Sequence, residues 1–444
     1  MSEVLIEGVW RLAQSGAEQV VHNPATLKPV AVAPYCDAQD VVSAMTAARR
    51  ALGSWRARPR EERTALLVEV GRALSACAPD IAGLQALESG QAYHECLDAA
   101  LAAARCFTQL AGPDPGGARA AGLSTGPAAA ARPLLIQQEY PLLHWACSAA
   151  ALLDEGSTLV CVAPRIAPLA VLRAARCAGG LPEGVLNVLV ASPEAVTAAL
   201  GDTLLREQET PVATGAGPGG SDTIFVGNAV ELNLTLAGAA SQRLFHSGQR
   251  AGQSTRIYVE QQRSHQLVDE LHEFLAFLEC GDPSKPATDL GSLCSSDALQ
   301  RVEDQVARAL RHGALLKVGG RRYQPWGLRG YFFQPTLMIE GRGEERAPDE
   351  EIRGPVVIIS PVRNLAEVLR QQPARRIAFF GHDLDVQLRS LTAAGINFQV
   401  ANPTTPLERI LQGFRGASPG PVRIEPVTSS QCSWFPYRGG AAPT

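Results

Sequence analysis

Lysine is scarce in this chain of 444 residues, and basic side chains do not outnumber acidic ones. Lysine occurs at Lys28, Lys285 and Lys317, so the other 37 of the 40 basic residues are arginines. With 44 acidic residues the formal net charge is −4. A chain of this charge lacks the basic field that holds nucleic acid or an anionic membrane surface. We therefore expect neither among its partners.

Long hydrophobic runs and paired cysteines are missing as well. The longest apolar run, residues 142–153, contains a histidine and is too short to cross a bilayer. The first residues include acids where a signal peptide carries positive charge. The ten cysteines form no CxxC pair. This usage favours reduced, mostly buried thiols in a cytoplasmic protein.

The composition is that of a large folded protein. Hydrophobic residues make up 46% of the chain and charged residues 19%, which is enough apolar material for an extensive core. General disorder is therefore excluded. The length exceeds that of a usual single domain and indicates two or three packed units.

The first third is predicted to be helical after a short β start. Residues 4–10 alternate like a strand. Asp37 is a typical helix N-cap, Pro59 is favoured in a first helical turn, and Gly90 ends a helix. These signals predict three successive helices, and a fourth is expected over about 91–110.

From residue 134 onwards the pattern is α/β. Apolar strands are expected at 134–137 and 158–162 and after the turn at 180–184, with a helix over 167–177. Strand, helix and strand in this order predict a parallel sheet. A second α/β unit is expected to follow, with helices at 263–279, 297–312 and 384–394 and strands at 257–260, 331–339, 356–361, 377–380 and 396–401.

Eight short motifs follow one another along the chain, and their order is informative. They are Asn23-Pro-Ala-Thr, Ser54-Trp, Tyr140-Pro-Leu-Leu, Gly180-Leu-Pro-Glu-Gly-Val-Leu-Asn-Val, Phe245-His-Ser-Gly-Gln-Arg, Thr255-Arg-Ile, Gly330-Tyr-Phe-Phe-Gln-Pro-Thr and Glu350-Glu-Ile-Arg-Gly-Pro. Each is weak alone, but together they resemble the NAD(P)-dependent aldehyde dehydrogenase superfamily over nearly the whole chain. Residues 248–250 and 401–405 look most like the N-succinylglutamate-5-semialdehyde dehydrogenase branch.

The resemblance implies an α/β fold with two Rossmann-like domains and a small oligomerisation element. A nucleotide-binding type of domain would comprise residues 1–111 and 134–228, and a catalytic type of domain residues 229–416. Residues 112–133 and 417–444 would form the bridging element. The family's interfaces imply a homo-oligomer, or a hetero-oligomer with an active aldehyde dehydrogenase.

The positions that carry the family's chemistry hold unsuitable residues here. The family uses a cysteine thiolate as nucleophile, a glutamate as general base and an asparagine amide for the oxyanion. The resemblance aligns these three with Ala251, Gly217 and Glu139. A methyl group, a hydrogen atom and a carboxylate cannot replace them, so no catalytic residue of the family's kind is expected.

The cofactor positions are also altered. The resemblance aligns the family's ribose-binding lysine with Cys161, and the glycine-rich turn that meets the pyrophosphate is not found between residues 189 and 218. Glu351 keeps the position that holds the nicotinamide ribose, but Arg353 replaces an aromatic residue beside it. We expect no cofactor, or NAD or NADP if any binding is retained.

These changes predict a pseudoenzyme that serves as a structural or regulatory subunit. One alternative is an NAD(P)-linked oxidoreductase or an esterase that works with displaced residues. Another is the sensing of a small ligand, with Glu139 and Arg353 changing the charge of the old substrate tunnel.

Single residues offer further, weaker hypotheses. His246 beside Ser247 suggests a hydrolase, and Cys147 or Cys294 could reach the tunnel as a displaced thiol. Residues 217–220 form a glycine-rich turn without the lysine of a phosphate loop, and Glu350-Glu351 is a carboxylate pair expected to be solvated. The histidines show no metal-like clustering, so no metal is expected.

Overall fold

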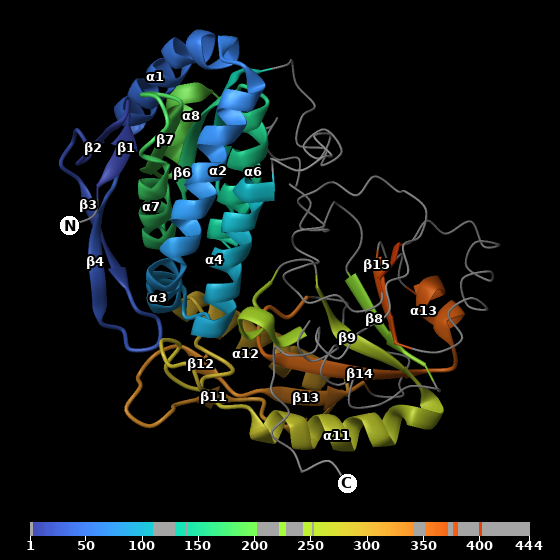
Figure 1. Ribbon diagram of the computed structural model, residues 1–444. Helices are drawn as coiled ribbons and strands as arrows, with labels where there is room; N and C mark the ends of the chain where they lie inside the picture. The colour runs from blue at the N-terminus through green and yellow to red at the C-terminus, as the bar shows by residue number, and fades with distance from the viewer. Residues whose placement is uncertain are drawn as a thin grey trace, which may run out of the picture.

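Two sheets organise the chain into two units that lie side by side (Figure 1). The computed structural model describes residues 3–109, 129–138, 140–201, 222–227, 243–250, 253–340, 351–371, 376–380 and 399–401. The first unit is built on a five-stranded sheet and the second on a seven-stranded sheet. Both are mixed sheets with helices packed against them, as the α/β prediction requires.

The predicted helices of the first third are confirmed. They are α1 (Ala38–Ala57), α2 (Arg60–Ala76), α3 (Ala78–Ser89) and α4 (Tyr93–Thr108). Asp37 caps α1 by accepting hydrogen bonds from two backbone N–H groups, and Gly90 ends α3 with a left-handed φ of 77°. In Figure 1, α2 and α4 lie side by side over the strands of the first sheet. The two helices approach closely at Gly71 of α2, where a Cβ would lie 2.8 Å from the Ala104 carbonyl oxygen of α4.

The strand predicted over residues 4–10 is instead a hairpin. Glu7 and Gly8 have φ values of 58° and 79°, which reverse the chain between two short strands. The predicted alternation is not found either, since all three residues of Val4–Ile6 are buried. The turn was missed because Glu–Gly is not a strong turn signal.

The first sheet has the order β2-β1-β7-β6-β5. Its central strands pair in parallel, as predicted, and the N-terminal hairpin adds an antiparallel edge. β5 begins at residue 131, three residues before the predicted start. The strands are β1 (Val4–Ile6), β2 (Val9–Arg11), β5 (Ala131–Leu135), β6 (Thr158–Ala163) and β7 (Leu186–Val190).

The longest apolar run forms a core helix, α6 (Pro141–Asp154), in which nearly every residue is buried. The predicted helix at 167–177 is α7 (Leu169–Ala175) followed by a single 3-10 turn, and α8 (Pro193–Leu200) follows β7. No helix among the described residues is long and apolar enough to span a membrane.

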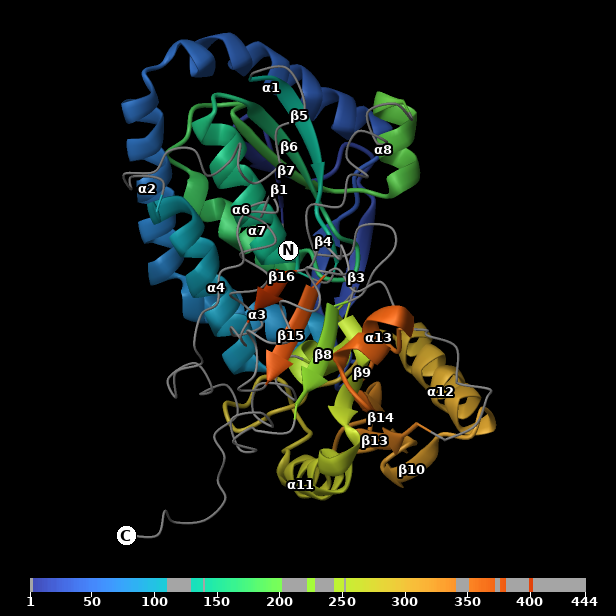
Figure 2. The same ribbon diagram turned by 90° about the vertical axis from the view of Figure 1, so that its right-hand side faces the viewer.

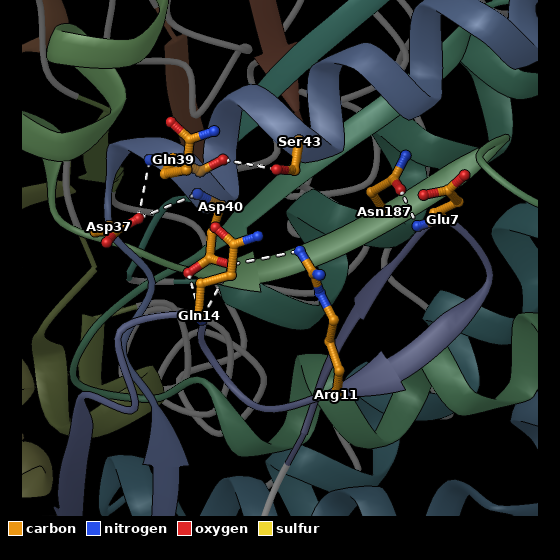
Figure 3. Close-up of polar contacts among 8 residues, drawn as sticks. All are labelled: Glu7, Arg11, Gln14, Asp37, Gln39, Asp40, Ser43 and Asn187. Carbon is orange, nitrogen blue, oxygen red and sulfur yellow. Dashed lines mark hydrogen bonds and ion pairs between the residues drawn. The ribbon is translucent and has the colours of Figure 1, made fainter.

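A polar cluster fastens the N-terminal hairpin to the start of α1 (Figure 3). The buried carboxylate of Asp40 accepts a hydrogen bond from the backbone N–H of Gln14 at 3.1 Å and pairs with Arg11 at 3.4 Å. Nearby, Asn187 of β7 accepts the backbone N–H of Glu7 at 2.8 Å. These bonds satisfy polar groups that the packing of the hairpin buries.

The second sheet has the order β10-β13-β14-β9-β8-β15-β16. All neighbouring strands pair in parallel except β10 with β13. Figure 2 shows this sheet below the first one, with α11 and α12 beside it. Its strands are β8 (Asp222–Val226), β9 (Gln253–Glu260), β10 (Leu315–Val318), β13 (Thr336–Ile339), β14 (Val356–Val362), β15 (Arg376–Phe380) and β16 (Gln399–Ala401).

The helices predicted at 263–279 and 297–312 are confirmed as α11 (Ser264–Phe277) and α12 (Ser296–Arg311), and α13 (Leu365–Gln371) adds a third. The single strand predicted over 331–339 is wrong. It is divided into β12 (Phe332–Phe333) and β13, because Pro335 between them has no N–H to donate to a ladder. The helix predicted at 384–394 lies outside the described residues.

The hairpin of β3 (Glu18–His22) and β4 (Pro29–Pro34) ties the first unit to the second. At its tip, the carbonyl of Pro24 accepts the backbone N–H of Tyr331 at 2.9 Å. At the start of α4, the N–H of Tyr93 donates to Pro283 at the same distance. Backbone bonds thus cross directly between the two units.

No disulfide joins the nine described cysteines. Three of them are buried, but the other six are half-buried, so "mostly buried" was an overestimate. Cys77 and Cys177 show why: both lie at helix ends at the margin of the core.

Candidate functional site

A cavity of about 410 Å³ opens where the two units meet. The loops after β5 and β6 form one side, and the turn at residues 245–248 with the start of α12 forms the other. Ligands of α/β proteins commonly bind beyond the carboxyl ends of parallel strands, at such a junction. This cavity is therefore the candidate functional site.

A strained turn forms the inner wall. His246 and Ser247 are buried and have φ values of 53° and 51°, a left-handed conformation that ordinary side chains rarely adopt. The backbone N–H of His246 donates to both carboxylate oxygens of Glu95, at 3.2 and 3.0 Å. Burial raises the pKa of Glu95 to about 8. Strained residues held in this way cluster at ligand sites.

Arg243 holds the same turn from behind. Its buried guanidinium donates to the carbonyl of Gly248 at 3.0 Å and to that of Gly354 at 2.8 Å. Burial lowers the pKa of Arg243 to about 10. A Cβ on Gly248 would lie 2.0 Å from the Gly354 carbonyl oxygen, so only glycine fits there. The turn is fixed to the segment that carries Glu351.

Ser247 does not form the hydrolase pair considered from the sequence. Its hydroxyl donates a hydrogen bond to the carbonyl of Gly291 at 2.9 Å, which is a structural contact. A serine nucleophile needs its proton taken by a neighbouring base. The geometry of the described residues gives no support to that hypothesis.

Cys294 does line the cavity, and Cys147 does not. Cys294 stands just before α12, and its Sγ accepts a weak hydrogen bond from the amide of Gln138 at 3.6 Å. Its backbone N–H donates to the side chain of Gln249 at 2.9 Å. Burial raises the pKa of the Cys294 thiol, which lowers its thiolate fraction at neutral pH.

The other displaced thiol considered from the sequence has a different setting. The Sγ atom of Cys147 in α6 lies 2.9 Å from that of Cys106 in α4. This contact belongs to the helix layer of the first unit, so Cys147 has no role at the cavity.

Glu351 and Arg353 form an ion pair at the mouth of the cavity. The Nε of Arg353 lies 3.6 Å from the Glu351 carboxylate, and both side chains are partly exposed. The backbone carbonyl of Glu351 accepts a hydrogen bond from Gln305 of α12 at 3.0 Å. Of the residues expected to bind a cofactor, Glu351 lines the cavity. Its negative charge is partly neutralised by the guanidinium of Arg353.

Cys161 lies in the hydrophobic core. It is fully buried in β6, next to the indole of Trp145, and burial raises the pKa of its thiol far above the ordinary value. Val162 faces the other side of the strand and is equally apolar. Neither face of β6 offers an amine at this level. The position that the resemblance aligns with the family's ribose-binding lysine thus holds a buried thiol.

The three positions aligned with the family's catalytic groups, Ala251, Gly217 and Glu139, lie outside the described residues. Gln138 and Gln249 both line the cavity, one from each unit. No group of three metal-ligating side chains occurs within the described ranges.

Sequence reasoning named Arg353 as a cation of the site but missed Arg301. Arg301 and Gln305 line the cavity from α12, together with Ala298 and Cys294. Their spacing of three and four residues is that of one helical face, and the helix itself was predicted. The sequence could not show which other segments that face meets.

Comparison with known proteins agrees with this architecture. The model of the aldehyde dehydrogenase family matches residues 10–209 and 212–378, well over half of the chain. The chain belongs to the aldehyde dehydrogenase family. The predicted resemblance is confirmed at this level, and so is the α/β aldehyde dehydrogenase fold.

The relatives are distant. The chain is 26% identical to the succinate-semialdehyde dehydrogenase [NADP(+)] GabD of Escherichia coli over 83% of its own length and 82% of the relative's. It is 25% identical to a betaine aldehyde dehydrogenase of Bacillus subtilis, over the same shares of the two chains. These proteins share the family with it, and their names describe their own activities.

Solved structures show the same fold. An NADP-dependent enzyme of E. coli superposes with a TM-score of 0.78 at 24% identity, covering 89% of both chains. The NAD+ complex of an aldehyde dehydrogenase from Bacillus cereus superposes with a TM-score of 0.76 at 22% identity, covering 90% of this chain and 87% of that one. Aldehyde dehydrogenases of this fold thus bind NAD+ or NADP+.

Proposed function

We propose that this chain is a non-catalytic member of the aldehyde dehydrogenase family that serves as a structural or regulatory subunit. The observation that carries the proposal is the side chain at position 251, where a methyl group stands in place of the family's nucleophilic thiol. Gly217 and Glu139 remove the base and the oxyanion donor as well. Losses of this kind cost several orders of magnitude in rate.

The residues aligned with the family's cofactor-binding positions support the same proposal. Cys161 is buried in the core, and Glu351 is engaged by Arg353. We propose that neither NAD nor NADP is bound under physiological conditions. Titration of either dinucleotide, followed by tryptophan fluorescence, should give no saturable signal at millimolar concentration.

Within the family, we propose that the chain belongs near the N-succinylglutamate-5-semialdehyde dehydrogenases, on the support of the sequence at residues 248–250 and 401–405. We propose a homo-oligomer, or a hetero-oligomer with an active aldehyde dehydrogenase. The bridging element expected at 112–133 and 417–444 lies mostly outside the described residues, and its residues 131–133 belong to β5 of the first sheet. The absence of disulfides among the described cysteines suits a cytoplasmic site of action.

The experiment that tests this role is size determination at native concentration together with affinity purification from the native cell. The proposal expects a species larger than a monomer, or co-purification with an aldehyde dehydrogenase. A lone monomer that captures no such partner would contradict it.

One observation favours a second candidate, an NAD(P)-dependent semialdehyde oxidoreductase with displaced residues. Cys294 and Glu351 line the same cavity, so a thiol and a carboxylate are both present. Formation of NADH or NADPH from a semialdehyde, abolished by Cys294→Ser, would establish this candidate. The raised pKa of Cys294 argues against it.

A further inference from the structure

Two thiols away from the cavity lie against each other between neighbouring helices of the first unit. The Sγ atoms of Cys106, in the last turn of α4, and Cys147, in the middle of α6, are 2.9 Å apart. No disulfide joins them. The sulfur atoms of a disulfide lie about 2.05 Å apart, so these two need to approach by only about 0.9 Å to bond.

The packing around the two thiols holds the helices in place. Phe107 follows Cys106 in α4, and Trp145 precedes Cys147 by two residues in α6. The rings of Phe107 and Trp145 are both buried, and their centroids are 5.7 Å apart. Two reactive groups that a rigid structure holds together meet far more often than groups on separate molecules. This arrangement favours a bond within the chain over a bond between chains.

The thiol pair is also open to solvent. Cys147 is the one residue of α6 that is not buried, and Cys106 is half-buried as well. By contrast, Cys36, Cys96 and Cys161 are buried. Oxidation of cysteine follows exposure, and fully buried thiols are inert. A small oxidant therefore reaches Cys106 and Cys147 more easily than it reaches the thiols of the core.

We propose that Cys106 and Cys147 form a site of reversible oxidation, at which hydrogen peroxide converts the two thiols into a disulfide. The thiolate of one cysteine attacks the peroxide: an S–O bond forms, the O–O bond breaks, and the departing hydroxide takes up the thiol proton and leaves as water. The second thiol attacks the resulting sulfenic sulfur: the S–S bond forms, the S–O bond breaks, and a second water leaves. The two thiols together lose two electrons, which the peroxide gains.

This bond would tie α4 to α6. Because it would link residues 41 positions apart in the sequence, it would restrict the unfolded chain and stabilise the first unit. A dithiol reductant would reverse it by thiol–disulfide exchange. Transient, redox-sensing disulfides of this kind are the usual ones in reducing compartments. The modification goes beyond the proposed subunit role and needs neither a dinucleotide nor a partner chain.

Peptide mapping of the full chain after mild treatment with hydrogen peroxide tests the proposal. Remaining thiols are blocked with N-ethylmaleimide, and the chain is digested with trypsin and Glu-C. This digestion releases peptides 106–119 and 140–155, each with a single cysteine. The two peptides should be recovered linked from chains that run singly on a non-reducing gel, and dithiothreitol should separate them. Cys106→Ala or Cys147→Ala should abolish the link. Cys280→Ala, which removes a half-buried thiol of the second unit, is the matched control and should keep it.

Thermal unfolding supplies a second measurement. Peroxide treatment should raise the unfolding midpoint of the chain by several degrees, and dithiothreitol should reverse the shift. Cys147→Ala should lose the shift, and Cys280→Ala should retain it.

Three results would overturn the proposal. The first is a link between other cysteines in place of this one, such as Cys77 with its neighbour Cys177. The second is conversion of Cys106 or Cys147 to a sulfinic or sulfonic acid without a link. The third is a bond that joins two chains. None of these results bears on NADH formation or on assembly, so this proposal and the proposed function fail separately.

Discussion

At the scale of single residues, we propose that alanine at position 251 and glycine at position 217 stand where the family has two groups that act on an aldehyde. Restoring both by Ala251→Cys with Gly217→Glu should still give no NADH formation. The reason is that we propose nucleotide binding to be lost as well: Cys161, aligned with the family's ribose-binding lysine, is buried in β6, and the sequence has no recognisable pyrophosphate turn before residue 219. A coupled absorbance assay with a semialdehyde and NAD+ measures this directly. Slow turnover in the double variant would show that the alignment of residues 189–216 is wrong.

Asp154 is a residue on which stability depends. Its carboxylate is 5% exposed, accepts Thr64 at 2.6 Å and pairs with Arg60 at 2.6 Å. Asp154→Ala should lower the free energy of unfolding by about 1–2 kcal/mol, because Thr64 and the partly exposed Arg60 lose their shared acceptor. Urea denaturation measures the change. Asp80→Ala is the control: that carboxylate is 72% exposed beside Arg173, and its loss should cost less than about 0.5 kcal/mol. Equal losses in the two variants would contradict the assignment.

Some residue roles could be predicted from the sequence and others could not. Asp37 and Gly90 act through local backbone geometry, which sequence spacing reports. The hydroxyl of Ser247 donates to Gly291, which is 44 residues away in the sequence. The sequence could not show this contact, so the adjacency of His246 and Ser247 suggested a hydrolase pair that the structure does not support.

At the scale of elements, Gly90 at the end of α3 packs closely against Ser292 of the second unit. Its φ is +77°, and a Cβ there would lie 2.3 Å from the Ser292 hydroxyl. Gly90→Ala should lower the free energy of unfolding by about 2 kcal/mol or more, through backbone strain and the clash. Gly53→Ala, in exposed space on α1, should instead stabilise by up to about 1 kcal/mol, because alanine favours the helix. Thermal unfolding of the two variants tests both, and a neutral Gly90→Ala would refute the close approach.

The short helix α7 depends on a buried acid. Both carboxylate oxygens of Glu88 accept backbone N–H groups, from Leu169 at 2.6 Å and Ala170 at 2.8 Å. Burial raises the pKa of Glu88 from 4.5 to about 8. Between these values the folded chain holds a proton that the unfolded chain releases. The contribution of Glu88 to stability is therefore full below pH 4.5, falls as pH rises, and levels off above about 8.

Urea titrations from pH 5 to pH 8.5 should show this decline, and Glu88→Gln should reduce its slope because the amide does not titrate. The pKa of Glu95 is also raised to about 8, so Glu95 too makes the free energy of unfolding fall as pH rises. That part of the pH dependence remains in Glu88→Gln. An unchanged slope in Glu88→Gln would contradict the assignment.

The elements themselves were largely predictable. Capping residues and apolar periodicity located α1 to α4, α11 and α12. Two predicted strands were wrong because one or two residues interrupt them. The chain reverses at Glu7 and Gly8, and Pro335 separates β12 from β13. Short edge strands such as β10 carry too little periodic signal to be seen.

At the scale of the whole molecule, the resemblance predicted the fold, and the family match confirmed it. The cavity could not be predicted, because its wall joins the ends of β5 and β6 to the first turn of α12 and to a strained turn. Arg301 lines the cavity only because these segments come together, and no sequence motif marks it. The same assembly leaves no amine on either face of β6 at residues 161 and 162.

The central claim is that this assembled molecule cannot carry out the oxidation for which its family is named. The most direct measurement is NADH or NADPH formation by the purified full chain, with a semialdehyde substrate and either dinucleotide at millimolar concentration. We predict no rate above that of the buffer. Cofactor reduction that depends on the protein, and that disappears in Cys294→Ser, would contradict the claim.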